Sequence, residues 1–202
     1  MSNILTLPVY EVLALERLVR SCKSNDANVQ EDFTSKLMRT CMFVDVRGLR
    51  FTVTVGTSYF MVRRWFLAYE QTAADGYYVL DACDVKTAVK GLSVNSIASI
   101  DMDTVLRKVV NPDWLKHLDF DSFCDARNVK TGVGAQMFNA GLLAGVTRCI
   151  AELRPTRPVL WHTPDKSYIP MCAEVEGLDF TIKKGEVCYG NLTAILMPVK
   201  GC

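Results

Sequence analysis

The sequence lacks closely spaced cysteine pairs, and this absence excludes two kinds of site. Its eight cysteines are at positions 22, 41, 83, 124, 149, 172, 188 and 202, so no two are closer than 14 residues. Structural zinc sites and thiol redox motifs take two cysteines from a single turn, as in Cys-x-x-Cys. The cysteines therefore predict small buried side chains rather than metal ligands or a redox pair.

Histidine is also scarce, and the common catalytic motifs are missing. The two histidines, His117 and His162, belong to neither a His-Glu-x-x-His nor a His-x-Glu pattern, and there is no Gly-x-Ser-x-Gly. Gly132-Val133-Gly134-Ala135 lacks the third glycine of a dinucleotide-binding loop, so it predicts a strand-to-helix turn. We predict a binding protein that is not an enzyme and needs no cofactor.

Long hydrophobic runs and an excess of charge are absent as well. Apolar runs such as Tyr59–Val62 and Gly141–Val146 fall far short of the ~20 residues that cross a bilayer. The first residues lack the basic segment and length of a signal peptide, so we expect a cytoplasmic protein without a membrane segment. The net charge of +1 argues against strong attraction of nucleic acid to the whole surface, but it allows one basic face.

What the sequence does contain is a helix followed by antiparallel strands, repeated about three times. Ile4–Val9 is extended, and Tyr10–Lys23 has the apolar stripe of an amphipathic helix. From Leu37 the hydrophobic period changes to two, which predicts strands at Leu37–Val46, Leu49–Val55 and Tyr59–Gln71. After a turn at Asp75-Gly76, we predict a strand at Tyr77–Leu80 and a short helix that Asp81 or Asp84 caps and Gly91 ends.

The third round predicts extended Asn128–Val133 and a helix over Ala135–Leu153. Five strands follow, at Val159–Thr163, Tyr168–Val175, Leu178–Lys183, Glu186–Tyr189 and Leu192–Val199, and the turns include Glu176-Gly177, Lys184-Gly185 and Gly190-Asn191. This order predicts an α+β protein with antiparallel sheets.

Several segments, in this order and spacing, resemble the bacterial β sliding clamp, the ring-forming processivity factor of replicative DNA polymerases. Leu37–Asp101 is similar to its first domain, including Val55-Gly56-Thr57-Ser58, Tyr78-Val79-Leu80-Asp81 and Lys90-Gly91-Leu92. Asn111-Pro112-Asp113-Trp114 is similar to the step into the last clamp domain, and Ala194–Val199 to the terminal strand. The resemblance implies sheets outside, helices inside and a homo-oligomeric ring.

The chain also departs from this family. A bacterial clamp subunit has three domains of two half-units each, whereas three helix-plus-strands units are found here and a fourth is hard to find in Met102–Arg127. We therefore expect a shortened, phage-type clamp, with one domain at residues 1–110 and an abbreviated second domain at residues 111–202. Ring closure stays open.

The resemblance implies two binding sites. Clamps line their pore with basic helices that contact double-stranded DNA without reading its sequence. The matching cations are Arg17, Arg20, Lys23, Lys86, Lys90 and Arg148, although an ordinary solvated helix face would look the same. The second site is a hydrophobic groove for a short linear motif of a DNA polymerase or clamp loader. Its residues would be Gly56, Thr57, Tyr59, Met61, Pro112, Lys116, Leu196, Met197, Pro198 and Val199.

Two other interpretations remain open. A clamp-derived adaptor or inhibitor could keep the peptide groove without forming a ring, which the missing half-unit and weak charge favour. An unrelated small phage protein could show the same strand pattern by chance. For Met61 and Met197, core packing is an equally good explanation of an apolar side chain.

Overall fold

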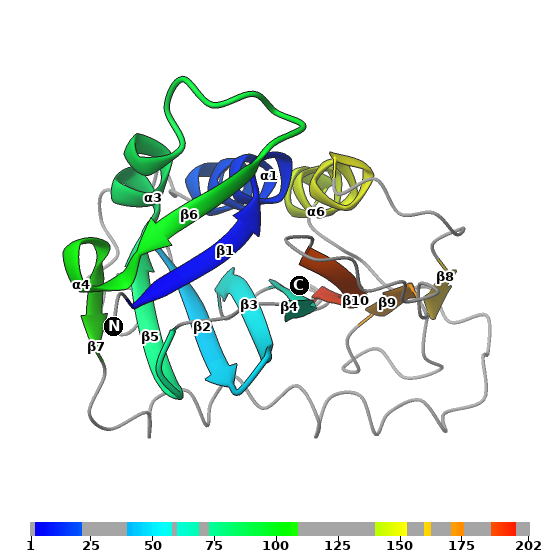
Figure 1. The fold of residues 1–202 in the computed structure, drawn as a ribbon. Coiled ribbons are helices and arrows are strands. Elements are labelled where there is room, and N and C mark those ends of the chain that lie inside the picture. Colours follow the sequence, from blue (N-terminus) through cyan, green and yellow to red (C-terminus); the bar gives the residue numbers. More distant parts are fainter. Residues whose placement is uncertain are drawn as a thin grey trace, which may run out of the picture.

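The computed structural model describes residues 3–21, 40–57, 60–68, 73–108, 140–152, 160–162, 171–175 and 187–196. The elements in these ranges are drawn in Figure 1. In chain order they are β1 (Ile4–Pro8), α1 (Val9–Ser21), β2 (Cys41–Arg47), β3 (Arg50–Thr57), β4 (Phe60–Ala68), β5 (Gly76–Asp81), α3 (Ala82–Ala88), β6 (Ile97–Asp101), α4 (Met102–Val105), β7 (Leu106–Lys108), α6 (Ala140–Glu152), β8 (Leu160–His162), β9 (Met171–Val175) and β10 (Val187–Leu196).

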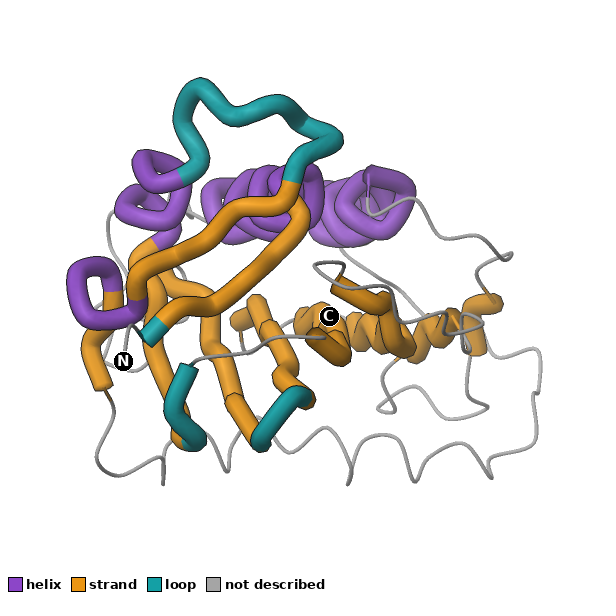
Figure 2. The backbone as a smooth tube through the Cα atoms, in the orientation of Figure 1, coloured by secondary structure: helices purple, strands orange, loops and turns teal. Residues whose placement is uncertain are grey.

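Eight of the strands form one antiparallel sheet in the order β7-β5-β2-β3-β4-β10-β9-β8. Strands from both ends of the chain therefore meet in its middle, where β10 pairs with β4. β1 and β6 form a separate two-stranded sheet, seen in front of the helices and the larger sheet in Figure 2. The predicted α+β class with antiparallel sheets is confirmed.

Three helices lie in a row on one face of the eight-stranded sheet (Figure 1). α1 is the middle helix, because it contacts both α3 and α6. It also packs on β2 and β3, while α6 packs on β4 and β10. We call the solvent-exposed surface of these three helices the helix face, and the opposite surface of the sheet the outer face.

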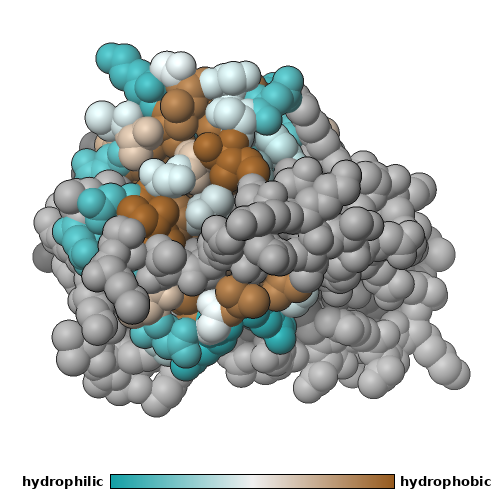
Figure 3. Space-filling view, viewed as in Figure 1, coloured by the Kyte–Doolittle hydropathy of each residue, from teal (hydrophilic) through white to brown (hydrophobic). Residues whose placement is uncertain are grey.

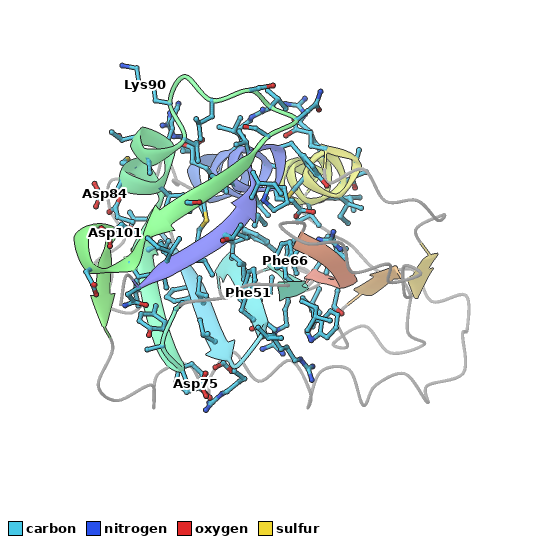
Figure 4. The ribbon with its side chains drawn as sticks, viewed as in Figure 1. Phe51, Phe66, Asp75, Asp84, Lys90 and Asp101 are labelled. Carbon is cyan, nitrogen blue, oxygen red and sulfur yellow. The ribbon has the colours of Figure 1, made fainter. Side chains whose placement is uncertain are left out.

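Alternation along the strands separates the core from the outer face. Successive side chains of a strand point to opposite sides, so every second residue faces the helices. Phe51 and Phe66 are register partners on this side, and their rings stack at 4.9 Å between centroids (Figure 4). The buried helix-side residues include Met42, Val44 and Val46 of β2, Val53 and Val55 of β3, Phe60 and Val62 of β4, Tyr78 and Leu80 of β5, and Leu192, Ala194 and Leu196 of β10.

The elements expected from hydrophobic period are largely present. The helix predicted over Tyr10–Lys23 is α1, and the strands around the Arg47-Gly48 turn are β2 and β3. Gly48 makes that turn with φ +57°, a left-handed conformation that favours glycine. Asp81, rather than Asp84, caps α3: its side chain accepts a hydrogen bond from the Cys83 backbone N–H at 2.8 Å.

One predicted turn is wrong. Gly190-Asn191 does not separate two strands, because β10 runs from Val187 to Leu196 without a break. The register against β4 shifts between Tyr189 and Leu192 instead. Glycine in a strand favours such an irregularity, so the same two residues signal a bulge as readily as a turn.

Some expectations lie outside the described residues. These are the extended segment Asn128–Val133, the strand Leu178–Lys183 and most of Met102–Arg127. The division between residues 110 and 111 stays a prediction. None of the helices in the described ranges is long and apolar enough to span a membrane.

Candidate nucleic-acid interface and peptide groove

The helix face carries five of the six cations predicted to contact DNA. Arg17 and Arg20 are exposed on α1, Lys86 on α3 and Arg148 on α6, while Lys90 is exposed in the turn just after α3. Figure 4 shows Lys90 pointing away from the sheet at the edge of the molecule. The sixth, Lys23, lies outside the described residues. The structure thus brings residues from three separate segments onto one surface.

The five cations differ in how far acidic neighbours neutralise them. Arg17 Nη1 lies 2.9 Å from Glu152 Oε1 of α6, and Arg20 forms an ion pair with Glu16 one turn earlier. Within the described ranges, neither Lys86 nor Lys90 makes an ion pair, although exposed Asp84 lies near Lys86 on α3. The α3 end of the helix face is therefore where a phosphate would find cations that are not already paired.

The close packing of α1 and α6 explains why their cations share a surface. Val146, Cys149 and Ile150 of α6 are buried in the common core. The Cys149 thiol points at the backbone carbonyl of Ala14 on α1, with Sγ 3.8 Å from the oxygen. A small side chain at Ala14 leaves room for this close contact, and the exposed Arg17 of α1 reaches Glu152 of α6.

A buried ion pair attaches α1 to the sheet. Glu11, in the first turn of α1, and Arg64, on β4, are both almost fully buried. Arg64 donates from Nη2 to Glu11 Oε1 at 2.8 Å and from Nε to both carboxylate oxygens at 3.2 Å. Burial raises the pKa of Glu11 above its usual value, and the charge and hydrogen bonds of Arg64 oppose this rise. The pair fixes which side of α1 faces the sheet.

The residues predicted for a peptide groove are only partly brought together. Gly56 and Met61 are register partners on β3 and β4, and both face the outer side. A Cβ on Gly56 would lie 2.6 Å from the Phe60 backbone oxygen, so only glycine fits this close approach of two strands. Leu196 points the other way, into the core opposite Phe60.

Met61 itself is buried, with Ile195 of β10 as its partner across the strands. The described part of the site is therefore a packed sheet surface at Gly56, Met61 and Ile195. The side chain of Thr57 and the residues Tyr59, Pro112, Lys116, Met197, Pro198 and Val199 lie outside what the structure describes. Their role in peptide binding stays a prediction.

Sequence reasoning missed a cluster of arginines and aromatic rings on the outer face. Arg47 lies over the Tyr77 ring at 4.9 Å, and Arg50 lies over the Trp65 ring at 5.0 Å. We call these four residues, which come from the adjacent strands β5, β2, β3 and β4, the outer row. The sequence does show arginine and aromatic residues close together in the predicted strands. It does not show that these residues share one surface, because that depends on how the strands pair.

Asp45 organises the outer row. Its carboxylate Oδ1 lies 2.9 Å from Arg47 Nε. Partial burial raises the pKa of Asp45, while the charges of Arg47, Arg63 and Arg50 lower it. Three guanidinium groups therefore act on one carboxylate, and the cluster remains positively charged overall.

The described residues contain no group of three or more histidine, cysteine, aspartate or glutamate side chains that could hold a metal ion. The helix face and the outer face are instead cationic or apolar. Such surfaces suit anionic polymers and peptides.

No known protein family model and no curated protein matches the sequence. Solved structures do match the fold. A putative DNA polymerase III beta subunit from Eubacterium rectale has a TM-score of 0.53 and 9% identity, over 98% of this chain and 66% of that one. A DNA polymerase sliding clamp from Pseudomonas aeruginosa has a TM-score of 0.55 and 11% identity, over 99% and 67%.

The Caulobacter crescentus pol III beta structure is similar to a comparable degree, with a TM-score of 0.51 and 8% identity over 98% of this chain and 66% of that one. The chain thus spans about two thirds of the length of these structures. At such low identity the likeness shows the fold alone. The chain has the fold of a DNA sliding clamp, as the family resemblance of its segments implied.

Proposed function

We propose that this protein is a DNA sliding clamp, a processivity factor that encircles double-stranded DNA and tethers a polymerase to it. The observation that carries this proposal is the row α3-α1-α6. These three helices lie on one side of a clamp-like sheet, and Lys86, Lys90, Arg17, Arg20 and Arg148 are exposed on them or in the turn after α3. A concave series of such surfaces, contributed by several copies, would present cations to a duplex from all sides.

Cations on helices suit this function because phosphate contacts carry no sequence information. Lys86 and Lys90 would contact successive phosphates as the protein moves, and no contact would hold it at one position. Each neutralised phosphate releases counterions, so contact with DNA weakens as salt rises. A closed ring, in contrast, stays linked to the duplex when these contacts are weakened.

Tethering would follow from this topological link. A polymerase that binds the clamp through a short linear motif remains near its primer at a high effective concentration, even when its own grip on DNA is brief. The outer-face residues Gly56 and Met61 would form part of the groove for that motif, and a clamp loader would use the same groove. The partners are therefore duplex DNA, the polymerase, the loader and further copies of this chain.

The proposal is tested by separating encirclement from charge. Linear duplexes biotinylated at both ends are incubated with the protein, which can thread over open ends, and streptavidin is then added to block them. A ring stays on blocked DNA through a high-salt wash and leaves after a restriction enzyme cuts the duplex. Release by salt alone, equal for blocked and open DNA, would contradict encirclement.

Light scattering distinguishes the clamp from the non-ring adaptor. A clamp is expected to form a stable oligomer of defined stoichiometry, because a chain this short must join other copies to surround a duplex. A protein that stays monomeric at all concentrations, yet still binds a polymerase peptide, would favour the adaptor. A monomer that binds neither DNA nor such a peptide would contradict both.

A further inference from the structure

The function proposed above assigns no role to the outer row, which lies on the face of the sheet opposite the helices. Arg47, Arg50 and Trp65 occur at alternate positions relative to the buried Val46, Phe51 and Phe66 of their strands. Tyr77 alternates in the same way with buried Tyr78 on β5. All four side chains of the row therefore point away from the helix layer.

The row crosses four neighbouring strands. Tyr77 belongs to β5, Arg47 to β2, Arg50 to β3 and Trp65 to β4, and these strands are adjacent in the sheet. At ~4.8 Å between strands, the row is about 14 Å long, which is the length of two or three nucleotides in an extended strand. Arg47 and Arg50 are direct register partners in its middle, and both are exposed.

Both arginines are held against neighbouring aromatic rings, and Arg47 is also held through its edge atoms. Arg47 uses its edge atoms internally: Nε lies 2.9 Å from Asp45 Oδ1, and Nη2 donates to the Tyr77 hydroxyl at 2.8 Å. Arg50 stacks on Trp65 with its guanidinium carbon 5.0 Å from the ring centroid. Each guanidinium thus lies over an aromatic ring, while the arginine remains exposed to solvent.

The hairpin that carries both arginines is fixed in place. The Gly48 backbone N–H, between them in sequence, donates to Asp75 Oδ1 at 2.7 Å. Figure 4 places Asp75 just before the start of β5, beside the β2–β3 turn. Figure 3 shows hydrophilic atoms along this lower edge of the described surface. The row is consequently a preformed surface and not two independent flexible side chains.

We infer that the outer row binds single-stranded nucleic acid, with bases stacking on the exposed guanidinium groups of Arg47 and Arg50. Sheet surfaces with aromatic residues, and arginine planes, are used in this way to stack unpaired bases. A duplex does not fit, because its bases are already stacked on one another. An acidic peptide fits less well, because a carboxylate binds the guanidinium edge and Arg47 already uses its edge on Asp45 and Tyr77.

In a clamp, this surface would hold unpaired template outside the ring while the helix face surrounds the duplex. The inference does not depend on ring formation, since binding of a single strand to the outer row can be measured on the purified chain in any oligomeric state. Its test and the end-blocking test therefore fail independently.

The test is fluorescence anisotropy with a labelled oligo-dT of about 12 nucleotides, a size typical of single-strand sites. Arg50→Lys keeps the charge but removes the flat guanidinium. It is expected to raise the dissociation constant for oligo-dT about fivefold or more, the effect of losing one stacked base. The control Ser99→Ala changes an exposed residue of β6, outside both cationic surfaces, and should leave oligo-dT binding unchanged.

Three results would overturn the inference. The first is that the wild-type chain does not bind oligo-dT. The second is that Arg50→Lys binds it as tightly as the wild type does, while its unfolding midpoint by circular dichroism is also unchanged. The third is that polyglutamate displaces the oligonucleotide as effectively as unlabelled oligo-dT, which would make the outer row a general anion or acidic-peptide surface.

Discussion

The helix face and the outer row are both cationic, but they hold their charges in different ways. Lys86 and Lys90 end in compact ammonium groups on flexible stems, and neither is ion-paired within the described ranges. Arg47 and Arg50 lie over the rings of Tyr77 and Trp65. Mobile point charges suit phosphates that move past, whereas fixed planes suit a base that must stay in register. One sheet thus carries two cationic surfaces of different character on its two sides.

The two surfaces also depend on different parts of the core. The helix face exists only while α1 stays docked in one orientation, and the buried Glu11–Arg64 pair sets that orientation. The outer row depends on strand pairing among β5, β2, β3 and β4. Substitutions can therefore damage one surface and spare the other, and the following experiments use this separation.

Arg64→Met is expected to have the largest effect, and to act on the helix side. It leaves Glu11 buried without its cation, which costs about 3–5 kcal/mol when one partner of a buried pair is removed. Urea unfolding measures this loss. The double variant Glu11→Leu with Arg64→Met replaces both charges by apolar groups and should recover most of the stability. A single variant within about 1 kcal/mol of wild type would mean that the pair does not hold α1 in place.

Gly56→Ala is expected to have the next largest effect, and it acts on the outer side of the β3–β4 pair. Its new Cβ would meet the Phe60 backbone oxygen at 2.6 Å and Met61 Cα at 2.9 Å, so β3 and β4 must separate. Overpacking of this kind costs about 1–3 kcal/mol. The control is Gly48→Asn, where no atom lies within 4 Å of the new Cβ and asparagine tolerates the positive φ. Equal midpoints in urea for the two variants would show that the close approach at Gly56 is unimportant.

Much of this comparison could have been drawn from the sequence, but not the side of the sheet on which each residue lies. Hydrophobic period gave α1 and the strands around Gly48, because local alternation encodes them directly. It could not give the β4–β10 pairing, whose register partners are 119 to 136 positions apart in the chain. Since a one-residue change of register turns a strand over, Met61 and Leu196 could not be assigned to opposite faces.

Residue type alone was equally unable to separate the two kinds of cation. Arg17 and Lys86 look alike as basic residues on amphipathic helices, yet Arg17 is paired with Glu152 from α6, 135 positions away. Arg64 looks like one more basic residue within a strand, and its burial follows only from the docking of Glu11 above it. These features arise from tertiary contacts, so they become visible only when the fold is known.

Removing the unpaired lysines should weaken duplex binding more than removing a paired arginine does. Lys86→Gln with Lys90→Gln eliminates up to two phosphate contacts, so the slope of log affinity against log salt should become shallower by about 1.8 on a duplex. Arg17→Gln should change the slope less, because this side chain already neutralises Glu152. Anisotropy titrations of a labelled duplex at several salt concentrations measure both. A larger change for Arg17→Gln would contradict the assignment of the free cations to α3.

The smallest expected effect is on the pH dependence of stability. It is compared for two carboxylates, Glu11 on the helix side of the sheet and Asp45 on the outer side. Burial raises the pKa of Glu11 in the folded chain above its usual 4.5, so the folded state binds that proton more tightly than the unfolded chain does. Its contribution to stability is therefore complete below pH 4.5 and is lost as pH rises through the folded-state pKa. One proton limits the slope to about 1.4 kcal/mol per pH unit. Urea unfolding at stepped pH should show this falling stability in wild type but not in Glu11→Gln.

The matched variant on the outer side is Asp45→Asn. The pKa of Asp45 is also raised by burial, from the usual 3.8, but this carboxylate is partly exposed and three arginines oppose the rise. The pH range over which Asp45 loses its contribution to stability therefore begins lower than the range for Glu11. The free energy lost is also smaller, because solvent screens the partly exposed carboxylate. If Asp45→Asn removed as much of the pH dependence as Glu11→Gln, the outer face would be as closed to water as the core, and Arg47 and Arg50 could not be open to a base. The pH comparison thus tests, without any nucleic acid, the exposure on which the inferred single-strand site depends.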